Sequence, residues 1–198
     1  MSQQVFKFEE RHDYLPENFL ISASNSAAYD AARSFTENNY ALNIYGATSS
    51  GKTHLAHIAY DAAKEKTLHI VEDLDESSDE KDLFHLLNYA REHGKFVLIT
   101  SLVPAGELKF KLPDLTSRLA AINTVGIEQP DDNLVYMLFA RLFAAKQIKV
   151  SDDAINYLAA RSPRNFSEMR KIAEEIDRLS LAAKKNVSIN LIKQVIGQ

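Results

Sequence analysis

The stretch Tyr40–Ala59 reads YALNIYGATSSGKTHLAHIA and decides the fold of this chain. A short apolar run, Ala41–Tyr45, ends at a glycine, and the residues that follow, Gly46–Thr53, match the pattern GxxxxGK[ST] without a mismatch. Apolar residues then recur at helical spacing, at Leu55, Ala56, Ile58 and Ala59. The stretch therefore predicts a strand, a phosphate-binding loop and a helix, in this order. A Gly/Ser-rich turn that matches by accident is the alternative.

The chemistry of phosphate binding explains the spacing of this loop. Its backbone N–H groups turn inward around a phosphate, and the positive end of the following helix favours negative charge. Gly46 and Gly51 allow the backbone to approach closely. Lys52 can reach the β- and γ-phosphates, and the Thr53 hydroxyl can ligate Mg²⁺. The expected nucleotide-binding residues also include Ala47, Thr48, Ser49, Ser50 and His54.

The composition of the chain excludes several classes of protein. The chain has 198 residues, of which 45% are hydrophobic, so it can bury one sizeable core or a core with a small additional domain. It has no cysteine, which excludes disulfides and cysteine-based metal or redox sites. No apolar run is long enough to span a bilayer, and the N-terminus lacks the pattern of a signal peptide, so a cytoplasmic location is expected. The net charge of −4 does not suggest general nucleic-acid binding.

The first residues, 1–17, mix charged side chains with isolated apolar ones and read as an extended arm. Within the arm, Gln3, Phe6 and Phe8 have the spacing with which a peptide lays two aromatic rings into a groove on a partner. An ordinary N-terminal strand or a frayed tail is the reading that the residues alone favour.

Further strands are predicted at Leu68–Val71, Phe96–Ile99 and Val125–Ile127. Helical patterns alternate with them, which predicts a doubly wound parallel α/β sheet over residues 18–129. Polar residues follow two of these strands: Glu72 and Asp73 follow one, and Ser101 lies just beyond another. The carboxyl ends of parallel strands meet at one edge of the sheet, so we expect these side chains at the nucleotide cleft. A solvated acidic turn is the other interpretation of the acids.

From residue 130 onward the pattern is helical only. Helices are predicted over Asp131–Ala145, Ser151–Arg161, Ser167–Lys184 and Ser188–Ile196, with Asp131 and Ser151 as N-caps. Residues 130–198 are therefore expected to form a small helical domain.

The ordered set of motifs resembles the AAA+ modules of the DnaA/Hda family of bacterial replication proteins, and most closely their short Hda-like branch in the reduced form of alphaproteobacteria. Besides the phosphate loop, the resemblance lies in the segments FLISASNSAA (19–28), LFHLLN (83–88), PDLTSRL (113–119) and VGIEQPD (125–131). It covers nearly the whole chain. It implies an AAA+ sheet sandwiched by helices and followed by an all-α lid.

The resemblance also implies a function. A member of the Hda-like branch binds ADP or ATP with Mg²⁺ and contacts the DNA polymerase III sliding clamp through an N-terminal peptide, here carried by Gln3, Phe6 and Phe8. On the clamp it stimulates hydrolysis of ATP held by the AAA+ domain of DnaA. Arg118 would then be an arginine finger that enters the site of DnaA. Without the family, a surface salt bridge would be the favoured role for Arg118.

Three departures from the family pattern bear on the chain's own chemistry. Too few residues lie between Lys52 and Glu72 for a further strand and helix, so the sheet is expected to be reduced. The acidic pair is Glu72-Asp73, which places Glu72 at the Mg²⁺ position and Asp73 at the water-orienting position. Ser167 stands where the family has a sensor arginine, and Arg164 and Arg170 are its candidate replacements.

These features leave three functions to compare. The first is a regulator that acts on DnaA; the second is a self-sufficient ATPase of the initiator or loader type; the third is a nucleotide-free scaffold. The sequence ends after the lid-like segment, so no helix-turn-helix and no direct sequence-specific DNA binding are expected. Self-association stays open.

Overall fold

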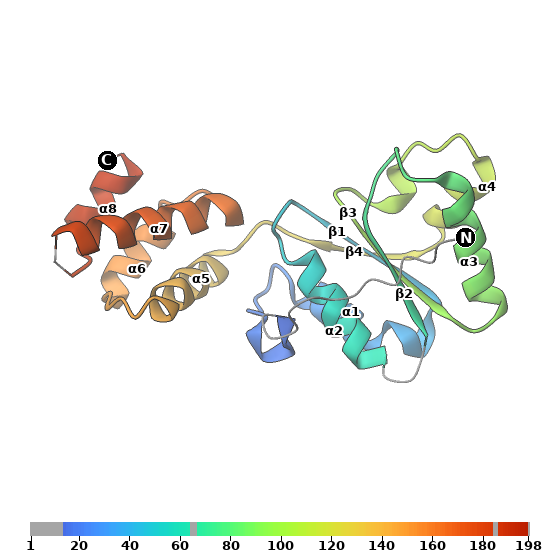
Figure 1. The fold of residues 1–198 in the computed structure, drawn as a ribbon, viewed down its shortest axis with the longest axis horizontal. Coiled ribbons are helices and arrows are strands. Elements are labelled where there is room, and N and C mark those ends of the chain that lie inside the picture. Colours follow the sequence, from blue (N-terminus) through green and yellow to red (C-terminus); the bar gives the residue numbers. More distant parts are fainter. Residues whose placement is uncertain (1–13, 64–66, 184–185, 198) are drawn as a thin grey trace.

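A parallel sheet forms the centre of the larger domain (Figure 1). The computed structural model describes residues 14–63, 67–183 and 186–197. The strands are β1 (Ala41–Gly46), β2 (Leu68–Leu74), β3 (Phe96–Ser101) and β4 (Asn123–Ile127). Their order is β2-β3-β1-β4, and every neighbouring pair is parallel. Strand β1, which leads into the loop after Gly46, therefore lies inside the sheet, and β2 lies at an edge.

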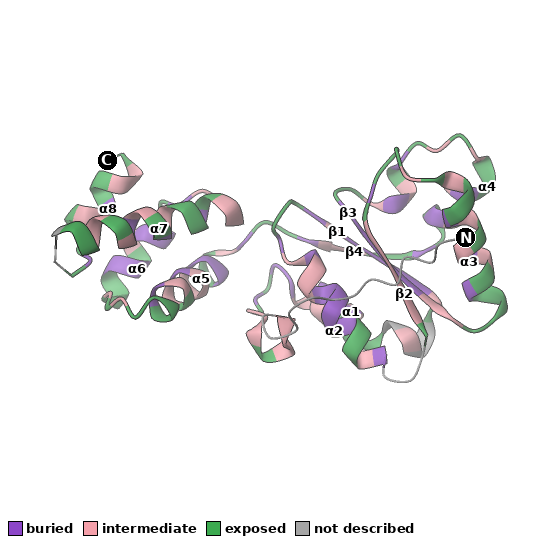
Figure 2. Ribbon diagram, in the orientation of Figure 1, coloured by how far each residue is buried: buried purple, intermediate pink, exposed green. Residues whose placement is uncertain are grey.

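Helices cover both faces of this sheet. Helices α1 (Ser26–Asn38) and α2 (Lys52–Ala63) pack on one face, against Leu42, Ile44 and Leu98. Helices α3 (Glu80–Glu92) and α4 (Pro113–Ala120) pack on the other, against Val97 and Ile99. Successive residues of one strand thus enter opposite cores, as a strand's alternation requires. The predicted α/β architecture is confirmed, and Figure 2 shows the buried positions concentrated between these layers.

The second domain is all-helical, as predicted. It consists of α5 (Asp132–Ala145), α6 (Asp152–Ala159), α7 (Phe166–Ala183) and α8 (Ile189–Ile196), which share a core around Phe139 and Phe143. Both predicted N-caps are present, because the Asp131 and Ser151 side chains accept hydrogen bonds from Leu134 N and Ala154 N. None of the helices in the described ranges has the length and apolar character needed to cross a bilayer.

Asp131 joins the two domains. One carboxylate oxygen accepts a 2.8 Å hydrogen bond from Leu134 N at the start of α5, and the other accepts a 3.1 Å bond from Ser24 N of the larger domain. Partial burial pushes the Asp131 pKa upward, but the bonds from Leu134, Ser22 and Ser24 outweigh it and hold the pKa below its ordinary value. The ionised form is therefore stabilised by folding, and this contribution is lost as the pH falls through the folded-state pKa.

Removing this side chain is expected to loosen the junction. Asp131→Ala loses the cap of α5 and should lower the free energy of unfolding by about 1 kcal/mol at neutral pH. Asp131→Asn has a single acceptor oxygen, so it can still cap Leu134 N but cannot also accept from Ser24 N, and it should retain only part of that stability. Urea denaturation of the two variants beside the wild type measures the difference. Equal midpoints for Asp131→Ala and the wild type would contradict the assigned role.

Candidate functional site

The loop between β1 and α2 has the geometry that its glycines predict. A side chain at Gly46 would place its Cβ 3.0 Å from Ser50 Oγ and 3.1 Å from Ile127 Cβ. Gly51 adopts a φ of +102°, a region that side chains disfavour. The chain therefore needs glycine at both positions to bring its backbone N–H groups around the start of α2. This arrangement suits a bound phosphate.

Lys52 is buried in this loop. Its Nζ donates hydrogen bonds to the carbonyl oxygens of Gly46 at 3.0 Å and Ala47 at 3.1 Å. Burial lowers the pKa of the amine, and the charge of Asp73 partly opposes that shift. A buried ammonium gains from a nearby anion, so the phosphates of a nucleotide fit the environment of this side chain.

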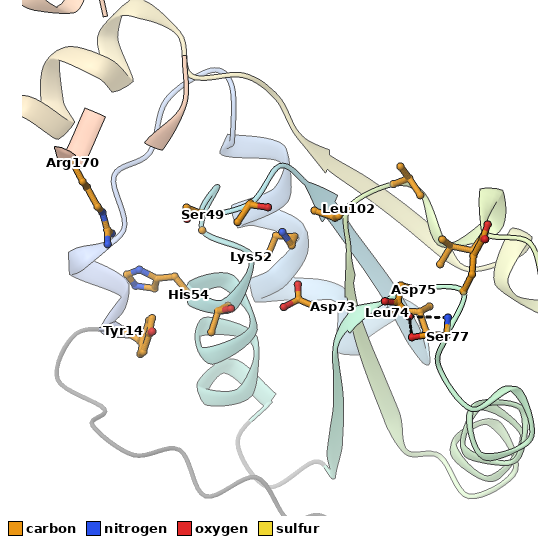
Figure 3. A pocket seen from close by; sticks show the side chains of 16 residues that line it. Tyr14, Ser49, Lys52, His54, Asp73, Leu74, Asp75, Ser77, Leu102 and Arg170 are labelled. Atoms are coloured by element: carbon orange, nitrogen blue, oxygen red, sulfur yellow. Dashed lines mark hydrogen bonds between the residues drawn. The ribbon is translucent and has the colours of Figure 1, made fainter. Parts of the chain in front are cut away.

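The acidic pair lies in a bulge of β2. The strand was predicted to end at Val71, but it continues to Leu74, because the extra residue at Glu72-Asp73 is accommodated by a shift in register against β3. Asp73 has a φ of +50°, and its N–H donates to Thr100 Oγ1 at 2.8 Å. Figure 3 shows the Asp73 carboxylate pointing toward Lys52, and Asp73 lines the same cavity.

Glu72 lies differently. It is not among the described residues that line the cavity, and its buried Oε1 has no hydrogen-bond partner among the described residues. Asp73 thus stands beside Lys52 and Thr53, whereas the sequence placed Glu72 at the metal. A buried carboxylate oxygen without a donor is costly, so Glu72 also fits a water or cation beside it.

The cavity of about 940 Å³ brings these residues together (Figure 3). Its wall includes Thr48, Ser49, Gly51, Lys52, Thr53 and His54 of the predicted site, and it extends past the end of β2 to Leu102 and Val103. The volume is within the range of small-molecule sites. The described residues hold no cluster of three or more His, Asp or Glu side chains that could bind a metal alone.

Known proteins match this chain in two ways. Residues 131–196 match the family model described as "Hda, lid domain". The DnaA of Cutibacterium acnes is 25% identical over 92% of this chain and 46% of its own length. An uncharacterized protein of Haemophilus influenzae is 29% identical over 58% of this chain and 50% of its own length. The chain thus spans about half the length of these curated relatives. The chain is thus similar to the DnaA/Hda family of AAA+ proteins, and its residues 131–196 match the Hda lid.

Solved DnaA structures share the fold. Domain III of Thermotoga maritima DnaA superimposes with a TM-score of 0.77 at 19% identity and covers 93% of this chain and 95% of its own. AMPPCP-bound DnaA from Aquifex aeolicus gives a TM-score of 0.71 at 19% identity, over 86% of this chain and 67% of its own. These likenesses show the shared fold, a parallel sheet flanked by helices and followed by a helical lid.

The lid contributes one arginine to the cavity. Arg164 donates to the Asp132 carboxylate and to Pro130 O, which keeps it at the domain junction. Arg170 lines the cavity and points from α7 toward the end that His54 and Tyr14 line (Figure 3). Ser167, one turn earlier, lies 3.0 Å from Ser49 of the loop, hydroxyl to hydroxyl. The structure therefore separates the two candidate arginines: Arg164 lies at the domain junction and Arg170 lines the cavity.

Arg118 lies apart from this cavity. It is half-buried on α4, with its guanidinium 5.1 Å from the centre of the Phe84 ring of α3. No ion pair joins it to another described residue, which sets aside the surface salt bridge that the residues alone favoured. Figure 1 shows α4 at the end of the larger domain that faces away from the lid.

Two further predicted residues have other surroundings. Ser101 is fully buried; its hydroxyl donates to Val103 O at 2.6 Å and accepts from Asn43 Nδ2 at 2.9 Å, so it shapes the cavity wall instead of lining it. His54 lines the cavity, and burial lowers its pKa.

Asn43 was not singled out from the sequence, although an amide in the otherwise apolar strand β1 was a visible signal. Its Oδ1 accepts from Ala105 N at 2.9 Å and so anchors the same wall.

The predicted peptide residues Gln3, Phe6 and Phe8 lie outside the described residues.

Proposed function

We propose that this chain is an Hda-type regulator of replication initiation. It binds ADP or ATP with Mg²⁺ and, together with the DNA-loaded sliding clamp, stimulates hydrolysis of ATP bound to DnaA. The observation that carries the proposal is the position of Arg118, a guanidinium with no ion pair among the described residues, outside the chain's own cavity. The lid match to Hda supports it.

The nucleotide would occupy the cavity. The backbone from Gly46 through Gly51 surrounds the phosphates, Lys52 neutralises them, and Arg170 reaches them from the lid. A relative of the same fold is described as bound to AMPPCP, which supports an adenine nucleotide here. Thr53 and Asp73 are the residues that would hold Mg²⁺, with Glu72 behind them. The ion would neutralise phosphate charge and order the loop.

The two acids should differ in their effect on Mg²⁺ dependence. Asp73→Asn removes the carboxylate that lies in the cavity, so at least about tenfold more Mg²⁺ should be needed for half-maximal binding of ADP, since losing even a supporting residue of a metal site typically costs about 10–100-fold in metal affinity. Glu72→Gln should change that requirement much less. Titration of Mg²⁺ at fixed fluorescent ADP measures both. A larger effect of Glu72→Gln than of Asp73→Asn would show that Glu72, and not Asp73, is the Mg²⁺ ligand.

The partner of Arg118 is DnaA in this proposal. A guanidinium that enters a neighbouring nucleotide site stabilises the charge that develops on the transferred phosphoryl group. The peptide with Gln3, Phe6 and Phe8 would bring the chain to the clamp, and therefore to newly replicated DNA.

A self-sufficient ATPase is the second candidate, favoured by Asp73 beside Lys52 and by Arg170 in the chain's own cavity. Steady-state phosphate release by the purified protein separates the two functions. The regulator predicts slow turnover alone and fast phosphate release once ATP-bound DnaA and loaded clamp are added. Fast turnover without DnaA that disappears in Lys52→Ala would instead identify an ATPase.

A further inference from the structure

The segment Tyr14–Phe19, called the strap below, is packed against the helix that follows the phosphate loop. The Tyr14 ring stacks on the His57 ring with centroids 4.2 Å apart and an interplanar angle of 5°. The same ring meets His54 edge-on at 5.5 Å. His54 Nε2 lies 3.0 Å from the carbonyl oxygen of Leu15. The predicted N-terminal arm therefore becomes part of the cavity rim before it ends, and Tyr14 itself lines the cavity.

The strap also holds the loop and the lid. Arg141 of α5 donates to the Asn18 carbonyl oxygen and, at 2.9 Å, to Asn18 Oδ1. The Phe19 ring packs over Gly51, where an added Cβ would lie 3.1 Å from Phe19 Cε2. One short segment thus touches α2, the phosphate loop and the first helix of the lid.

The lid connects the residue that holds the strap to a residue that lines the cavity. Helix α5, which carries Arg141, shares its buried core with α7 through Phe139, Phe143 and Met169. Helix α7 carries Arg170 into the cavity. Packed helices move together, so the hydrogen bonds between Arg141 and the strap should influence the position of α7 and therefore of Arg170.

We propose that the strap and Arg141 are positioning elements of the nucleotide site: they hold the lid so that Arg170 meets the phosphates, and a bound nucleotide in turn holds the strap in place. The inference rests on the proposed nucleotide binding. Its physical basis is that a ligand binds more weakly when its competent state is only partly populated. By linkage, the ligand must favour the seated strap to the same degree.

A double-mutant cycle with fluorescent ADP and Mg²⁺ tests the positioning role. Arg170→Ala should weaken binding about tenfold, as the loss of a charge-assisted hydrogen bond does. Arg141→Ala should weaken it about fivefold, because the lid is then less often in place. The double variant should bind about as weakly as Arg170→Ala alone, since a displaced lid matters only while Arg170 is present. The inference would be overturned if the two losses of affinity multiplied in the double variant, or if Arg141→Ala bound ADP as tightly as the wild type.

Tyr14 supplies a matched pair and a reporter. Tyr14→Ala should weaken ADP binding about fivefold, whereas Tyr14→Phe keeps the ring and should bind like the wild type. The chain has no tryptophan, so Tyr14→Trp places a single indole in the strap. Its emission should shift on addition of ADP and Mg²⁺, with the same midpoint as binding. Constant emission at saturating ligand would overturn the inference.

If the wild type does not bind ADP at all, the proposed function fails; if it binds but the strap variants bind equally well, only the strap inference fails.

Discussion

Arg118→Ala should reduce the stimulated hydrolysis of DnaA-bound ATP by about 10³-fold, the lower end of what arginine fingers contribute. The expected cause is the loss of a guanidinium that stabilises phosphoryl charge in the site of DnaA. Binding of ADP by the chain itself should be unchanged, because Arg118 lies outside its cavity. The measurement is single-turnover release of phosphate from ATP that has been loaded on DnaA beforehand.

Two matched variants make that result specific. Arg118→Lys keeps the positive charge but loses the planar fork of donors, so it should restore only part of the rate. Arg91→Ala removes an exposed arginine from the neighbouring helix α3 and should leave the rate at the wild-type level. If Arg118→Ala stimulates DnaA fully, Arg118 is not the finger.

Lys52→Ala should weaken the binding of ADP with Mg²⁺ by about 100-fold, because a buried charge-assisted contact to phosphate contributes about 1.5–3 kcal/mol. The fold itself should tolerate the change, since Lys52 contacts two carbonyl oxygens and no described acid within salt-bridge distance.

Thermal unfolding with and without ligand measures this effect. A ligand bound only by the native state raises the unfolding temperature, so at an ADP concentration that just saturates the wild type the shift should be much smaller in Lys52→Ala. Lys149→Ala, at an exposed position of the lid, is the control and should respond like the wild type. An equal shift in Lys52→Ala would place the ligand away from the phosphate loop.

The phosphate loop could be predicted from sequence because its chemistry is local. GxxxxGK[ST] fixes both the backbone angles at Gly51 and the place where α2 begins. The caps Asp131 and Ser151 were predicted for the same reason, since a cap bonds N–H groups only a few residues away.

The side chains at the other end of the site could not be predicted in this way. The resemblance placed Glu72 at the Mg²⁺ position and Asp73 at the water-orienting position, but the bulge in β2, which depends on pairing with β3, brings Asp73 toward Lys52. Arg164 and Arg170 were equivalent in sequence, and the contact of Arg164 with Asp132 separates them. These outcomes depend on tertiary contacts between distant segments.

The strap is the clearest case of such a contact. Tyr14 and His57 are far apart in the sequence, and nothing in either segment alone indicates that their rings stack. The charged, mixed composition of residues 1–17 instead indicated an extended arm outside the core. A ring that packs on a distant helix leaves no periodic signal, so only the structure shows it.

Action in trans on DnaA is the central claim, and one measurement tests it most directly. DnaA is loaded with γ-labelled ATP, freed of excess nucleotide and mixed with this protein, with and without DNA-loaded clamp. Phosphate release should become fast only when both the protein and the loaded clamp are present, and should remain fast with substoichiometric protein. An unchanged rate of release in the complete mixture would contradict the account.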